Sequence, residues 1–156
     1  MEGGSIAKVF SYLKPSYIFT SIFLTILTGA TTFTLIVFFG ESLVIPPLVE
    51  EASKLLTISY SFHFAIVYTL TFALIEFIHY INIIISETGL LSRDFLIMRT
   101  LCIMLHFFYL SIQITGFKLY YKTQWKGYII ISFITAWLLH VAWNGFFGKF
   151  VFLLIL

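Results

Sequence analysis

The chain has 156 residues, of which 60% are hydrophobic, 20% aromatic and only 10% charged, and its mean hydropathy is +1.03. A soluble domain cannot bury so much apolar surface, so the composition predicts a single integral-membrane domain over residues 1–156, in a multi-pass protein of the cell membrane surrounded by the lipid bilayer. The net charge of +2 is too small to indicate a nucleic-acid partner, and the single cysteine, Cys102, excludes an intrachain disulfide.

Five apolar segments predict an all-α fold, a polytopic transmembrane helical bundle of about five spans. The expected spans are residues 17–39, 43–60, 62–85, 95–115 and 128–147. A tight turn at residues 59–61 would join the second and third spans. The stretch 116–127 carries three lysines and is expected to be a polar loop.

The second segment is the doubtful one, because Glu50, Glu51 and Lys54 interrupt its apolar residues. It fits either a span or an interfacial helix between two spans. The positive-inside rule favours a span, since Lys8, Lys14 and the lysines of the later loop then lie on one side of the membrane. This argument predicts five spans with the N-terminus inside.

In the five-span arrangement, several polar side chains lie near the middle of the membrane. They are Glu50, Glu51, Glu76, His106 and His140. Polar residues without a function would gather at span ends, where long side chains reach water easily. Their common depth therefore predicts a buried polar site.

The residue types at this site are those that activate water. A carboxylate such as Glu50 or Glu51 can take a proton from water, and His106 can share the proton or hold the water. His140 and Asn144 are four residues apart on one helix face and could donate hydrogen bonds to an oxyanion. Two histidines and a glutamate are equally a catalytic zinc pattern, so the residue types leave the cofactor open.

Each of these residues also has a structural alternative. The carboxylates of the second segment could form a local ion pair with Lys54 on an interfacial helix. Glu76 could bond His79 or Tyr80 on its own helix face. The span histidines could join neighbouring helices by hydrogen bonds, and Arg99 is expected to snorkel or to pair with a nearby acid.

Four short motifs follow one another along the chain. Residues 50–54 read Glu-Glu-Ala-Ser-Lys, and residues 72–76 read Phe-Ala-Leu-Ile-Glu, followed by Phe77. His106 stands alone in the next span, and residues 140–144 read His-Val-Ala-Trp-Asn. In this order the motifs resemble those of the PrsW family, which usually has Asn at the position of Phe77. That family belongs to a superfamily of intramembrane proteases that includes type II CAAX prenyl endopeptidases and bacteriocin-processing enzymes.

The resemblance implies an intramembrane endopeptidase that cleaves a membrane protein or peptide substrate. Glu50 would be the general base on water, assisted by His106. His140 and Asn144 would stabilise the oxyanion. The resemblance leaves open whether the enzyme is of the glutamate type or metal-dependent, and what its oligomeric state is.

The same resemblance implies supporting roles for Glu51, Lys54 and Glu76. Glu51 would belong to the catalytic residues and, together with Lys54, would orient or neutralise the site. Glu76 would be a supporting acid or a ligand. In a metal-dependent enzyme, Glu50, His106 and His140 would bind a divalent metal such as zinc. Two other functions remain open, a non-catalytic scaffold or protease-complex subunit of the same fold, and a small proton-coupled transporter.

Overall fold

A computed structural model describes residues 14–40 and 42–155, with side-chain environments up to Phe146. The described residues contain helices and no strand, which confirms the all-α prediction. The helices are α2 Pro15–Phe39, α3 Ile45–Tyr60, α4 Phe62–Thr88, α5 Arg93–Thr123 and α6 Gly127–Ile155. Lys8, on which the topology argument drew, lies outside the described residues.

Four helices in the described part of the chain, α2, α4, α5 and α6, are long and apolar enough to cross a membrane. The second predicted span forms helix α3, but this helix has only 16 residues and is not among the four. At 1.5 Å per residue it is about 24 Å long, shorter than a hydrocarbon layer of about 30 Å. Of the five expected spans, the structure therefore supports four by length and composition.

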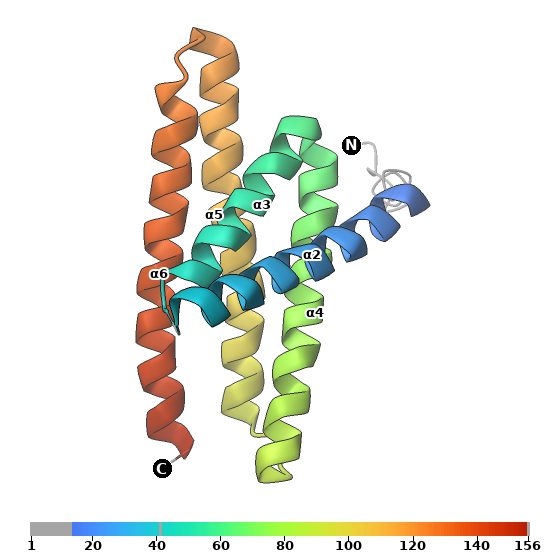
Figure 1. Ribbon diagram of the computed structural model, residues 1–156, viewed down its shortest axis with the longest axis vertical. Coiled ribbons are helices and arrows are strands. Elements are labelled where there is room, and N and C mark those ends of the chain that lie inside the picture. Colours follow the sequence, from blue (N-terminus) through green and yellow to red (C-terminus); the bar gives the residue numbers. More distant parts are fainter. Residues whose placement is uncertain (1–13, 41, 156) are drawn as a thin grey trace, which may run out of the picture.

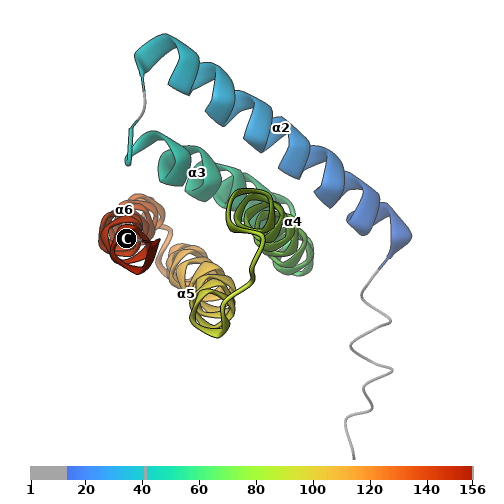
Figure 2. The ribbon, with the colours of Figure 1, turned by 90° about the horizontal axis from the view of Figure 1, so that it is seen from below.

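The short α3 lies at the centre of the bundle (Figure 1), where it packs against each of the other helices. The helices α5 and α6 form a long antiparallel pair, and α4 lies beside α5. Figure 2 shows α2 on the outside, across α3 and α4. Among the described residues α4 and α6 do not pack against each other, so α3 and α5 connect them from two sides.

The connection between α3 and α4 is a single residue, Ser61, in extended conformation with φ −166° and ψ 136°. This confirms the tight turn predicted at residues 59–61. Because there is no loop to separate them, α3 must fold back directly along α4. Pro46 and Pro47 lie in the first turn of α3, where a missing N–H costs little.

The predicted polar loop at residues 116–127 is wrong. Helix α5 continues to Thr123, and Gln124, with φ 61°, ends it in left-handed conformation. The lysines that suggested a loop lie on an exposed helical extension and on the short turn that follows it. Gly116 was expected to begin the loop, but it lies inside α5 where this helix packs closely against α6. A Cβ at this position would collide with the side chain of Ser132 and lie 2.7 Å from the Tyr128 carbonyl oxygen.

Candidate functional site

The Glu51 carboxylate is the centre of a buried network that joins three helices. Its Oε1 accepts hydrogen bonds from Lys54 Nζ at 2.6 Å and from His140 Nδ1 at 2.9 Å. Its Oε2 accepts from Gln113 Nε2 at 2.7 Å. Glu51 and Lys54 are both 0% exposed. Every polar group that meets this carboxylate is a donor, so Glu51 has the surroundings of an ionised acceptor and not those of a base.

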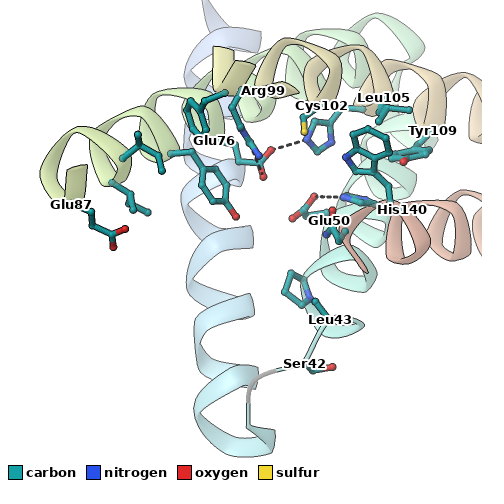
Figure 3. A pocket seen from close by; sticks show the side chains of 18 residues that line it. Ser42, Leu43, Glu50, Glu76, Glu87, Arg99, Cys102, Leu105, Tyr109 and His140 are labelled. Atoms are coloured by element: carbon teal, nitrogen blue, oxygen red, sulfur yellow. Dashed lines mark hydrogen bonds and ion pairs between the residues drawn. The ribbon is translucent and has the colours of Figure 1, made fainter. Parts of the chain in front are cut away.

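His140 is oriented by two contacts. Its Nδ1–H donates to Glu51, so the neutral ring has a bare Nε2. The Tyr109 ring stacks on it, with centroids 4.9 Å apart and planes 23° apart. The bare Nε2 lies 3.6 Å from Glu50 Oε2, too far for a hydrogen bond. Figure 3 shows Glu50 and His140 facing each other from α3 and α6.

Glu50 differs from its neighbour Glu51, although both glutamates come from the same helix turn. The Oε2 atom of Glu50 is buried and has no hydrogen-bond partner among the described residues. A buried carboxylate oxygen in this position is costly unless a water or ligand bonds it. This orphaned oxygen therefore indicates that Glu50 lacks a polar partner, which a small polar molecule on the cavity side of Glu50 and His140 would supply.

A second part of the network contains His106, Glu76 and Arg99. Lys54 Nζ lies 3.2 Å from His106 Nδ1, and since an ammonium has no lone pair, the lysine donates and Nδ1 accepts. The ring proton is then on Nε2, which donates to Glu76 Oε2 at 2.8 Å. Arg99 completes the chain, with its NH2 atom 3.3 Å from Glu76 Oε1 and its guanidinium 4.0 Å from the Tyr80 ring centroid.

A cavity of about 430 Å³ opens beside these side chains. It runs from Glu50 along α4 and α5 to Glu87, near the end of α4. The side chains that line it also include Glu76, Arg99, Cys102, His106, Tyr109, His140 and Asn144. In Figure 3, Ser42 and Leu43 of the α2–α3 connection border the same space. The cavity thus extends from the charged side chains toward the end of α4.

Glu50, His106 and His140 each offer a ligand atom, and these atoms lie within 4.8 Å of one another, so the group could hold a metal ion. His140 suits a ligand, because a carboxylate already holds its other nitrogen. His106 does not, because its two nitrogens already meet an ammonium and a carboxylate. A metal ion bound by all three would have to displace one of these partners, so in this arrangement the donor set does not fit a three-ligand zinc site.

The predicted residues come together from four helices. Glu50, Glu51 and Lys54 lie on α3, Glu76 on α4, His106 on α5, and His140 on α6. Asn144 lines the same cavity, one turn after His140. His106 was predicted to act beside Glu50, but the histidine that faces Glu50 is His140.

The ion pairs of Lys54 and Glu76 bear on two further expectations. The local ion pair on α3 joins Lys54 to Glu51, three residues away, and both belong to the larger network. Glu76 pairs with His106 and Arg99. The expectation that Arg99 pairs with a nearby acid is therefore confirmed.

Sequence patterns did not single out Gln113, which is buried in the network at 0% exposure. An uncharged amide is a weak signal within an apolar span. A usable signal was its spacing, because it lies seven residues after His106, two turns further along the same helix face. Tyr109 lies on that face as well, three residues after His106.

None of the family models, curated proteins or solved structures compared with the chain matches it.

Proposed function

We propose that the protein is an intramembrane endopeptidase of the cell membrane, related to the PrsW family, in which Glu50 activates a water molecule against a peptide bond. The observation that carries the proposal is the pair of bare acceptors, Glu50 Oε2 and His140 Nε2, that face each other at 3.6 Å beside the cavity. In the proposed complex, a water on the cavity side of this pair donates one hydrogen to each acceptor. Its lone pair is then directed away from the two acceptors, toward the cavity.

The reaction uses the residues in distinct roles. The water oxygen attacks the carbonyl carbon, and one water proton passes to Glu50. His140 Nε2 accepts the second hydrogen and keeps the water oriented. The Asn144 amide, one turn further along α6, donates to the oxyanion that forms. Glu50 then gives its proton to the leaving amine nitrogen as the carbon–nitrogen bond breaks, which leaves a carboxylic acid and an amine.

This assignment changes the roles expected for the two histidines. His106 was expected to assist Glu50, but its ring is held between Lys54 and Glu76. Its proposed role is to link these two charged groups at the wall of the cavity. His140 was expected to donate to the oxyanion, but its one ring proton is engaged by Glu51, so it acts on the water.

The proposal is of the glutamate type, without a metal step, because the donors around His106 are already paired. A chelator supplies a direct test. Purified protein dialysed against EDTA and 1,10-phenanthroline should retain its cleavage activity, and added Zn²⁺ should not increase it. Loss of activity on chelation with recovery on adding Zn²⁺ would show that Lys54 or Glu76 gives way to a metal ion.

The main experiment compares carboxylate-to-amide variants in detergent micelles. The probes are fluorescein-labelled casein and a panel of synthetic transmembrane peptides, with products identified by mass spectrometry. Glu50→Gln should lower kcat by at least about a hundredfold, because general-base catalysis contributes about 10²–10⁴-fold. Asp94→Asn is the matched control, since this carboxylate is exposed in the first turn of α5 and should leave cleavage unchanged.

Two outcomes would reject the proposal. The first is cleavage by Glu50→Gln at the rate of the unmodified protein. The second is the absence of cleavage of every probe by protein that is folded and in liposomes. In the second case, proton flux measured in the same liposomes separates the transporter alternative from a scaffold.

A further inference from the structure

The amide of Gln113 makes an unusual double contact with one residue of a neighbouring helix. Its Nε2 donates to Glu51 Oε2 at 2.7 Å and to the Glu51 backbone oxygen at 3.3 Å. An amide nitrogen carries two hydrogens, so both bonds can form at once. The Gln113 amide therefore bonds both the side chain and the backbone of Glu51, which fixes the position of the Glu51 carboxylate relative to α5.

The orientation of this amide is determined by its partners. With nitrogen and oxygen exchanged, the Gln113 oxygen would face a carboxylate oxygen and a carbonyl oxygen, and all three are acceptors. In the orientation present, Gln113 Oε1 is buried without a hydrogen-bond partner among the described residues. An orphaned amide oxygen in a span is costly, so the two bonds to Glu51 must outweigh that cost.

The consequences reach His140 through Glu51. With Oε2 held by Gln113, the Oε1 atom is left for Lys54 and for His140 Nδ1–H. This contact keeps the ring proton of His140 on Nδ1 and keeps Nε2 bare toward Glu50. Without the Gln113 donor, the carboxylate is free to turn both oxygens toward the lysine, and His140 loses its fixed acceptor.

We infer that Gln113 is a positioning residue, which sets the tautomer and orientation of His140 by anchoring Glu51. It touches neither the cavity nor the proposed water. This inference rests on the proposed function for its effect on catalysis, but not for its effect on His140, which can be observed in protein without any substrate.

The experiment uses Gln113→Met, which keeps the length of the side chain and removes the donor. Protein labelled with ¹⁵N in its histidines reports the tautomer of each ring by NMR, and a His140→Asn spectrum identifies the His140 signals. The unmodified protein should show His140 with its proton on Nδ1. Gln113→Met should show a mixture of tautomers. Thr69→Val is the control, since Thr69 is equally buried but lies on α4 outside the cavity lining, and it should leave the His140 signals unchanged.

Kinetics with a cleaved transmembrane peptide add a second readout. Gln113→Met should lower kcat by about 10–100-fold, by analogy with the loss of groups that orient metal-binding histidines, with KM nearly unchanged. If this variant does not fold, Gln113→Asn replaces it, because the shorter amide cannot reach both Oε2 and the backbone oxygen of Glu51. The same mixture of tautomers is expected.

The outcomes separate the two proposals. An altered tautomer in a protein that cleaves no probe would support the positioning role and reject the protease. An unchanged His140 tautomer in a folded Gln113 variant would overturn the positioning role, whether or not activity falls. Loss of thermal stability with no tautomer change would identify Gln113 as a packing residue only.

Discussion

The two faces of helix α3 use polar residues in opposite ways. One face presents Glu51 and Lys54 to charged and amide partners on α5 and α6. The other face presents Ser53 to Thr28, whose hydroxyl is also 2.9 Å from the Tyr68 hydroxyl. We call the first group the charged network and the second, Thr28, Ser53 and Tyr68, the hydroxyl seam.

The difference lies in where the hydrogen bonds can be made. In the seam, Ser53 also donates to the carbonyl of Val49 on its own helix, as Thr25 does to Ser21 on α2. The Ser53 hydroxyl is thus satisfied within its own helix, and uncharged hydroxyl contacts between helices each add only a little. Lys54 and Glu51 pair with each other within α3, but one pair does not satisfy two buried charges, so each also bonds partners on α5 or α6. The seam is therefore suited to packing, and the charged network to a site whose geometry several helices impose.

Lys54→Met should give the largest loss of stability in the charged network. Removing one member of a buried pair costs about 3–5 kcal/mol, because the Glu51 charge is left without its ammonium. The free energy of unfolding can be measured by SDS titration in mixed micelles. The double variant Glu51→Gln with Lys54→Met should recover much of the loss. If the single and double variants are equally unstable, the ion pair is not the source of the effect.

Gly116→Ala should give the next largest loss, because α5 and α6 approach each other closely at this residue. The added Cβ would collide with Ser132, and such overpacking costs about 1–3 kcal/mol. Gly29→Ala on α2 is the matched control, since nothing lies within 4 Å of its added Cβ. That change should stabilise the helix by about 0.5–1 kcal/mol. Equal melting temperatures for the two variants would contradict the close approach.

Tyr68→Phe should have the smallest effect of the three. It removes one hydroxyl from the seam, and interhelical hydrogen bonds in membranes average about 0.6 kcal/mol. Cleavage kinetics should be unchanged, because the seam lies on the far side of α3 from His140. Tyr60→Phe, at an exposed hydroxyl, is the control. A large fall in kcat for Tyr68→Phe alone would mean that the two faces of α3 are coupled.

Much of the candidate site could be predicted because charged residues are conspicuous in apolar sequence. Glu50, Glu51, His106 and His140 stood out in this way, and the structure brings them together. Gln113 did not stand out, because one amide in a span has many possible partners along its own helix and beyond. The extent of α5 was also misjudged, since an exposed helical extension and a polar loop have similar compositions.

The sequence by itself determined that this is an all-α protein with long apolar helices, because the length and hydropathy of a segment are local properties of the chain. It also determined which residues had to find buried partners. Only the tertiary structure decided that Glu51 is enclosed by donors while Glu50 keeps a bare oxygen. The two glutamates are neighbours in sequence, but successive helix residues point about 100° apart, so the packing of α3 against α5 and α6 assigns them different surroundings.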